Sequence, residues 1–178
     1  MNMTAQKHKI MMVAAAAALV FGGGLMAAPP ARAQNAVSVM ASNPQLSEWM
    51  SLVQNAGLGP AAATNQYTVF ALTNDGFDKL NAMWRGILKG EGANKSVNRQ
   101  RLQAIVRSQA VFGLHPASEF AGKVVTLQSV AGTPIVVDGT VEGQMKATMA
   151  YATGHQDGAP LTASNAVIYP IVATDVHQ

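Results

Sequence analysis

Histidines and carboxylates are the side chains of this sequence that could carry acid–base chemistry. Beyond residue 33 the chain has His115, His155 and His177, together with nine carboxylates, and the whole sequence has no cysteine. A nucleophilic hydrolase needs a nucleophile, a base and an orienting group that meet in space, and the G-x-S-x-G pattern of one such class is absent. No pair of carboxylates is singled out by its setting as acid and base. The sequence gives no support to catalysis, and we expect that the protein is not an enzyme.

A metal site is the second chemistry that these side chains could support. His155 and Asp157 lie two residues apart in a polar segment, downstream of Met145 and Met149, a combination that could bind copper or zinc. A closed site needs three or four converging ligands. His115 precedes a proline, where an extended and solvated side chain is expected, and methionine more often fills gaps in a core. We therefore expect no metal and no cofactor.

The first 33 residues have the pattern of a secretory signal peptide. Lys7 and Lys9 precede an apolar run from Ile10 to Met26, and Ala31-Arg32-Ala33 supplies the small residues that are typical of a cleavage site. The run is mostly alanine and glycine and is barely long enough to span a membrane. We expect cleavage before Gln34, which would leave a periplasmic or secreted chain with no integral membrane anchor.

Removal of this leader changes the charge of the chain. Twelve basic and nine acidic residues give a formal net charge of +3, but Lys7, Lys9 and Arg32 belong to the leader, which leaves nine basic residues against nine acidic ones. A neutral chain with no basic stripe is not expected to bind nucleic acid. The remaining residues suffice for one domain, which must rely on its hydrophobic core because it has no cysteine for a disulfide.

The segment from Tyr67 to Phe77 predicts a buried strand that runs directly into a helix. Residues 67–70 are β-branched or aromatic, the types that suit a pleated and half-buried surface. Thr73, Asn74 and Asp75 then offer side-chain oxygens to the free N–H groups of a helix start. The apolar positions that follow recur at spacings of three and four: Phe77, Leu80, Trp84 and Ile87.

A first helix is expected before this segment. Pro44 suits a helix start, and apolar residues follow at helical spacing as far as Gly57. Trp49 could stack on a ligand, but its position on this stripe favours packing in the core. Residues 34–41 are expected to form a short flexible arm, and residues 57–66 a loop.

The second half of the chain is expected to be rich in strands. A helix beginning at Ser96 passes into an extended segment at residues 110–112. From Lys123 the apolar residues alternate with a period of two, which predicts antiparallel strands joined by turns at Gly132 and Gly139.

The clearest alternation follows these turns. Its apolar face is expected to hold Val141, Met145, Ala147, Met149 and Tyr151. Residues 151–160 are expected to form a polar loop. Pro170 cannot donate to a ladder of hydrogen bonds, so the last strand must lie at an edge, be bulged or be interrupted there.

Two stretches resemble the signatures of the fasciclin domain family. Thr68 to Phe77 reads T-V-F-A-L-T-N-D-G-F and is similar to the first signature, T-V-F-A-P-T-N-x-A-F, with Leu72 in place of proline and Gly76 in place of alanine. Ala163 to Val176 resembles the second signature, typically A-S-N-G-V-I-H-V-I-D.

The resemblance also has departures. In the second signature Ala166 replaces glycine, Tyr169 replaces histidine and Val172 replaces aspartate. Members of the family usually carry a Tyr-His pair at the end of the preceding helix, where this chain has Ser108-Gln109. No role of that pair is carried over to these two residues.

The resemblance extends from Asn43 to Val176 and implies an α+β fold. We expect antiparallel β-sheets that form a wedge or sandwich, with several helices packed on one side, in a domain spanning residues 42–178. The implied function is an interaction module, acting in cell adhesion or envelope-associated binding through its surface. Its partner would be a protein, a polysaccharide or an envelope component.

The family also implies an alternative function, the transport of a small apolar ligand such as a carotenoid or another lipid. The residues that could form such a site are those of the face that holds Met145, Met149 and Tyr151, together with Trp49 and Trp84. These residues are more simply interpreted as core.

The two signatures provide the candidate binding residues. By resemblance, the loop of Thr73, Asn74 and Asp75 is a region of partner contact, and the second signature adds Ser164, Asn165 and Tyr169. A local interpretation exists for the same residues. Asn74 and Asp75 can cap a helix, with Asp75 favourably placed at the positive end of its dipole, and Ser164 and Asn165 suit a tight turn before a strand.

Overall fold

The computed structural model describes residues 34–80, 85–86 and 95–177, all within a compact unit that spans Arg32–Gln178. The described helices are α1 (Ala36–Ser42), η1 (Pro44–Leu46), α2 (Ser47–Asn55), α3 (Gly59–Thr64), α4 (Asn74–Asp78), α6 (Lys95–Ser108) and α7 (Ala117–Phe120). The strands are β1 (Tyr67–Leu72), β2 (Ala110–Phe112), β3 (Val124–Gln128), β4 (Pro134–Asp138), β5 (Lys146–Thr148), β6 (Ala152–Gln156), β7 (Leu161–Ala163) and β8 (Ala166–Val176). The expected α+β class is confirmed. Among these described helices, none combines the length and the apolar character that crossing a membrane requires.

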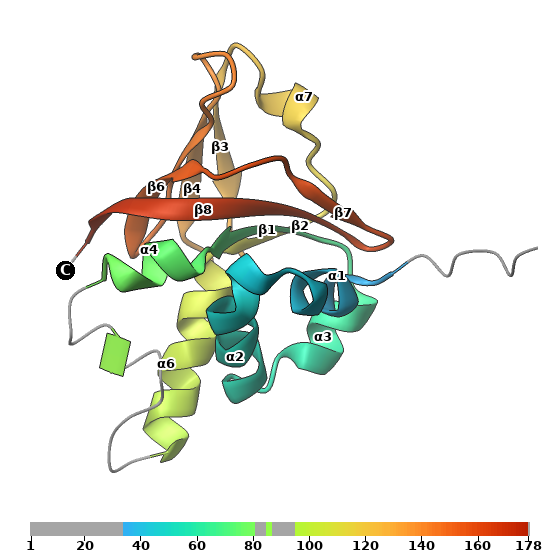
Figure 1. Ribbon diagram of the computed structural model, residues 1–178, viewed down its shortest axis with the longest axis vertical. Helices are drawn as coiled ribbons and strands as arrows, with labels where there is room; N and C mark the ends of the chain where they lie inside the picture. The colour runs from blue at the N-terminus through green and yellow to red at the C-terminus, as the bar shows by residue number, and fades with distance from the viewer. Residues whose placement is uncertain (1–33, 81–84, 87–94, 178) are drawn as a thin grey trace, which may run out of the picture. The chain divides into compact units, whose positions relative to one another are not determined.

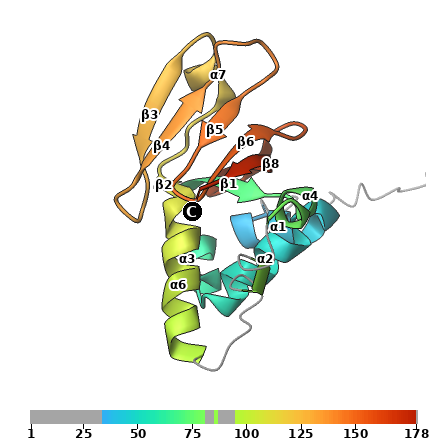
Figure 2. The same ribbon diagram turned by 90° about the vertical axis from the view of Figure 1, so that its left-hand side faces the viewer.

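The strands form one mixed sheet with the order β2-β1-β8-β6-β5-β4-β3, and β7 pairs with β8 beside this path. The neighbours are antiparallel except for β1 and β8, which run parallel because the chain crosses over between them. An isolated bridge between Val111 and Ser129 brings β2 close to the end of β3. The sheet is therefore nearly closed into a wedge, which Figures 1 and 2 show from two directions.

The long strand β8 lies in the middle of the sheet despite its proline. It pairs with β1 on one side, and on the other side with β7 along residues 166–168 and with β6 along residues 171–176. The carbonyl of Pro170 accepts a hydrogen bond from Asp157 N at 2.8 Å. Because the N–H and C=O of a strand residue point to the same side, the missing N–H of Pro170 falls where β7 gives way to β6. Strand β8 continues through Pro170, so it is neither interrupted nor at an edge, and the proline is accommodated where the pairing passes from β7 to β6.

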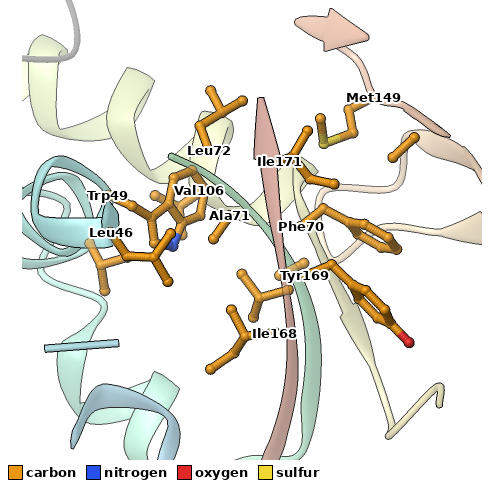
Figure 3. Close-up of a cluster of buried hydrophobic side chains, with 14 of the residues drawn as sticks. Leu46, Trp49, Phe70, Ala71, Leu72, Val106, Met149, Ile168, Tyr169 and Ile171 are labelled. Atoms are coloured by element: carbon orange, nitrogen blue, oxygen red, sulfur yellow. The ribbon is translucent and has the colours of Figure 1, made fainter. Parts of the chain in front are cut away.

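The β1–β8 pair separates two layers of the core. Figure 3 shows Leu46, Trp49 and Val106 on the helical side of these strands, and Phe70, Tyr169 and Met149 on the opposite side. All six side chains are buried. The helices α1, α2, α3, α4 and α6 cover the first face, while α7 lies near the β3–β4 hairpin (Figure 1). The predicted core positions of Trp49 and of strand residues 68–70 are confirmed, whereas Tyr67 is only partly buried.

Several predicted segments differ from the structure. Residues 34–41 do not form a flexible arm, because α1 begins there and buries Ala36 and Met40 in the core. Residues 57–66 are not a plain loop, since α3 occupies most of them. Three consecutive alanines in α3 have a high helix propensity that outweighs the glycine and proline at its start.

The predicted polar loop at residues 151–160 is also wrong in its first half. Strand β6 occupies Ala152–Gln156 and buries Ala152, Thr153 and Gly154 between β5 and β8. The residues of β6 are small or polar, and such residues are not typical of a central strand. The apolar face of Met145, Ala147 and Met149 is confirmed as buried, but Val141 lies outside the strand and is exposed. The expected helical positions Trp84 and Ile87 lie outside the described residues.

Candidate functional site

Thr73 stands where β1 ends and α4 begins. Its side chain is 1% exposed, and its Oγ1 accepts a hydrogen bond from Gly76 N at 3.3 Å, which makes it the N-cap of α4. The same hydroxyl donates to the carbonyl of Ile171 in β8 at 3.4 Å. Thr73 therefore satisfies the helix start and ties it to the central strand. It has no surface to offer to a partner.

Asn74 connects the first signature to the first helices. Its Nδ2 donates to the carbonyl of Pro44 at 2.9 Å and to Ser47 Oγ at 3.1 Å, and its Oδ1 accepts from Glu48 N at 3.2 Å. The N-cap position of α2 is held by Leu46, an apolar residue that has no side-chain acceptor. Asn74 supplies the missing acceptor from another element. Its amide is committed to the packing of α2 against α4.

Asp75 is the exposed member of the first-signature loop. It lies in the first turn of α4, where a carboxylate interacts favourably with the helix dipole. It lines a shallow hollow together with Thr73, Asn74 and Asp157, and Pro44 and Gln45 complete the wall. The two interpretations made from the sequence remain open for Asp75 alone, since Thr73 and Asn74 are occupied by internal hydrogen bonds.

Asn165 links four parts of the chain. Its Oδ1 accepts from Ala36 N at 2.8 Å, and its Nδ2 donates to the carbonyls of Ala62 at 3.0 Å and Asn65 at 2.8 Å. Its own carbonyl accepts from Tyr67 N at 3.1 Å. The side chain is 9% exposed. Asn165 therefore holds α1, the end of α3 and the start of β1 to the turn before β8, which confirms the predicted turn but gives the residue a structural task.

The neighbouring Ser164 is exposed, and its backbone N donates to the carbonyl of Gln34 at 2.9 Å. This contact fixes the chain just before α1.

Tyr169 lies inside the core. Its ring stacks on Phe70 with centroids 5.4 Å apart and meets Phe120 edge-on at 5.8 Å. Its hydroxyl donates to the carbonyl of His115 at 2.8 Å. Burial, with a smaller contribution from the charge of Glu119, raises the pKa of Tyr169 to about 12. The phenol stays neutral and serves the packing of the core, so Tyr169 is not a surface contact.

His115 is paired, which the sequence did not indicate. Its Nδ1 lies 3.0 Å from both carboxylate oxygens of Glu119, one turn away, and its Nε2 lies 3.2 Å from the carbonyl of Phe112. A His-Glu pair could serve as a base if a nucleophile faced it, but each ring nitrogen is already occupied. The i,i+4 spacing of the two residues on either side of Pro116 was the available signal.

The predicted metal candidates do not converge in the described part of the chain. His155 is exposed on β6, and Asp157 follows that strand. Across residues 34–80, 85–86 and 95–177, no three histidine, aspartate or glutamate side chains are grouped closely enough to hold a metal ion.

An exposed apolar patch lies at the end of β2, away from the signature loops. We define the β2 patch as Tyr67, Phe112 and Leu114. Phe112 is 62% exposed and Leu114 is 42% exposed. Phe112 stacks on the half-buried ring of Tyr67 with centroids 5.4 Å apart, because the two residues face each other across the β1–β2 ladder. The sequence does not indicate this patch, because the exposure of Phe112 depends on the position of β2 at the edge of the sheet.

The family comparison rests on more than the two signatures. The model of the fasciclin domain matches residues 44–173, which is most of the chain. The chain belongs to the fasciclin domain family. No curated protein matches its sequence.

Solved structures share the fold of this fasciclin domain. One is described as a "FAS1 domain pair from the insect cell adhesion molecule fasciclin I". It has a TM-score of 0.64 and 11% sequence identity, covering 79% of this chain and 50% of that one. The chain therefore spans half the length of this relative, which holds two such domains. The likeness establishes the fold.

The family's Tyr-His position is filled differently in this fasciclin domain. Ser108 and Gln109 are both buried at the end of α6. Ser108 Oγ donates to the carbonyl of Ile105 at 2.7 Å, and the carbonyl of Gln109 accepts from Phe70 N at 2.9 Å. The pair secures the junction of α6 with the sheet, and neither residue reaches the surface.

Proposed function

We propose that this protein is an exported fasciclin-type interaction module that binds a protein partner through the β2 patch. It acts in adhesion or in envelope-associated binding and is not an enzyme. The observation that carries this proposal is the exposure of Phe112 beside Tyr67 on a fixed backbone. Fasciclin domains are interaction modules, and the chain belongs to that family.

The backbone beneath the patch is held rigidly. Gly113 N donates to the carbonyl of Gln66 at 3.1 Å, and Thr68 Oγ1 donates to the carbonyl of Gly113 at 2.9 Å. The same hydroxyl accepts from His115 N at 2.8 Å. Gly113 has a φ of +91°, which allows the sharp turn between Phe112 and Leu114. A side chain on such a support loses little entropy on binding, which favours it as an anchor.

The chemistry of the patch favours a protein partner. An exposed aromatic ring that packs against a second ring is typical of the residues that dominate binding energy at protein interfaces. His115 and Glu119 lie beside it and provide the polar rim that such interfaces have. A polysaccharide or lipid partner would be an alternative outcome of the test described below.

The signature residues support this location indirectly. Thr73, Asn74, Asn165 and Tyr169 use their polar atoms within the domain. These hydrogen bonds stabilise the fold. The surface that contacts a partner is therefore expected among residues whose apolar groups face solvent.

The start of the described chain is compatible with export. The carbonyl of Gln34 is held by Ser164 N, and Asn35 caps α1 by accepting a hydrogen bond from Ser38 N at 3.0 Å. Cleavage before Gln34 would keep both contacts, because neither uses a residue of the leader. The intact mass of the secreted protein tests this step.

The binding test uses the processed protein and intact cells of the producing species. Fluorescently labelled protein should bind these cells saturably, and the double variant Phe112→Ser/Leu114→Ser should lose most of this binding. The control is Val124→Ser, because Val124 is 58% exposed on β3 and is not part of the patch. Pretreating the cells with protease should abolish binding. Equal binding by the double variant, or binding that survives protease, would refute the proposal.

The alternative function as a carrier needs a cavity. Of the predicted face, Met145 lines a hollow of about 510 Å³ with Phe120, Val141 and Gln156, whereas Met149 is buried in the core and does not line it. A different cavity exists on the helical side of the sheet.

A further inference from the structure

An apolar cavity of about 240 Å³ lies between the helical layer and the first strand. Its walls come from α1, α2, α3, β1 and α6, with Val130 from the turn after β3. Leu58, Ala62 and Tyr67 are only partly buried, so the cavity reaches the surface along α3. Figure 3 shows Trp49 and Val106, two of its lining residues, on the helical side of β1. Tyr67 belongs both to this cavity and to the β2 patch.

The cavity wall contains a buried donor with no acceptor. Trp49 is completely buried, and its Nε1 has no hydrogen-bond partner among the described residues. Most buried polar groups in proteins are paired, because an unpaired one loses its hydration without compensation. This nitrogen has no accessible surface, so it lies behind the wall, and the indole contributes an apolar surface to the cavity.

The mouth of the cavity carries a single positive charge. Arg107 lies in the last turn of α6, and its backbone carbonyl accepts from Ala131 N at 3.2 Å, which fixes the turn beside it. Within the described part of the chain, the only ion pair joins His115 and Glu119, so the guanidinium of Arg107 has no carboxylate partner there. The lining includes no acidic residue. The polar side chains that line the cavity are therefore the cationic guanidinium of Arg107 and the neutral hydroxyl of Tyr67.

We propose that this cavity binds a small monocarboxylic acid with an aromatic or branched apolar body. The carboxylate pairs with the guanidinium of Arg107, whose planar donors suit a carboxylate. The apolar body lies among Val53, Leu58, Val69 and Val106, against the indole of Trp49. This site is separate in function from the partner surface.

The volume of the cavity limits the size of the ligand. Taking about 30 Å³ for each water-sized unit, it holds roughly eight such units, which is below the usual range for drug-sized ligands. A carotenoid would fit by no more than one end group. The cavity therefore selects small acids in preference to long lipids.

The test titrates the processed protein with 3-phenylpropanoate, and with the neutral 3-phenylpropanamide as a matched probe. Calorimetry measures affinity, and the indole N–H signal of Trp49 in a ¹⁵N-correlated NMR spectrum reports occupancy, because the indole forms part of the cavity wall. We expect the acid to bind more tightly than the amide and to shift the Trp49 signal. Arg107→Gln should weaken the acid about tenfold or more while leaving the amide unchanged.

Two further variants complete the design. Ala62→Leu should fill the cavity and abolish binding of both probes. Arg101→Gln removes an exposed cation of the same helix that does not line the cavity, and it should bind like the parent. Unfolding midpoints establish that each variant is folded. No binding of the acid at millimolar concentration, equal binding of acid and amide, or equal effects of the two arginine substitutions would overturn the proposal.

Discussion

The side chain of Asn74 caps a helix to which it does not belong: its Oδ1 accepts the backbone N–H of Glu48 at 3.2 Å, in the first turn of α2. The same side chain donates to the carbonyl of Pro44 at 2.9 Å. The most distinctive polar residue of the first fasciclin signature thus acts as a clamp between α4 and the start of α2. Its neighbour Asp75 is exposed and makes no comparable clamp.

Asn74→Ala should destabilise the protein by about 1–2 kcal/mol, because it leaves the start of α2 without an acceptor. Asp75→Ala should change the free energy of unfolding by less than about 0.5 kcal/mol, since it removes only an exposed charge near a helix start. Urea unfolding followed by circular dichroism measures both variants. A larger loss for Asp75→Ala than for Asn74→Ala would contradict the role assigned to Asn74.

Asn165→Ala should cost more, about 3 kcal/mol, because the buried side-chain amide makes three hydrogen bonds, to α1, to α3 and to Asn65 at the end of α3. The control is Ser164→Ala in the same turn. The side chain of Ser164 is exposed and should contribute little to the free energy of unfolding. Hydrogen exchange provides a second measurement. Amides of α1 should lose protection in Asn165→Ala before those of β5 do, and uniform loss of protection would argue against a local clamp.

The parts of the fold that could be predicted are those with a strong local pattern. The strand at residues 67–72 combines β-branched and aromatic residues and ends at capping residues, so its type, burial and exit into α4 follow from the sequence. The buried face of Met145, Ala147 and Met149 follows from a period of two. The resemblance to the family supplied the way in which these elements assemble.

The remaining parts depend on contacts between segments that lie far apart in the chain. Pro170 indicated that one donor is missing from the hydrogen-bond ladder of the last strand. Only the register of β6 and β7 shows that this position lies inside a central strand. The tasks of Asn74 and Asn165 lie in bonds to residues at least 26 and 100 positions away. No local pattern encodes such partners. Likewise, the exposure of Phe112 depends on where β2 sits in the sheet.

Gly154→Ala should destabilise the protein by about 2–3 kcal/mol through overpacking. Gly154 lies at the register shift between β6 and β8, and a Cβ there would collide with the carbonyl oxygen of Val172 and lie 2.6 Å from Ile171 Cγ2. The matched control is Gly59→Ala in the first turn of α3, where an added Cβ meets nothing within 4 Å. That substitution should be neutral or stabilising by about 0.5 kcal/mol. Thermal unfolding distinguishes the two.

The last prediction concerns alkaline pH and Tyr169. The pKa of this phenol is about 12 in the folded domain, against about 10 for an unperturbed tyrosine. Below pH 10 the phenol is protonated in both states, and its contribution to stability is complete. Between pH 10 and 12 the unfolded chain releases the proton while the folded chain keeps it, so the free energy of unfolding should fall by roughly 2–3 kcal/mol.

Tyr169→Phe isolates this effect. At neutral pH the variant should be about 1 kcal/mol less stable than the parent, because it loses the hydrogen bond to the carbonyl of His115. Its free energy of unfolding should not show the fall between pH 10 and 12 that Tyr169 causes. The stability curves of the parent and the variant should therefore converge and cross as the pH approaches 12. Tyr67→Phe serves as the control, since it leaves Tyr169 in place and should keep the decline. Parallel curves for the parent and Tyr169→Phe between pH 9 and 12 would show that the buried phenol does not control alkaline stability.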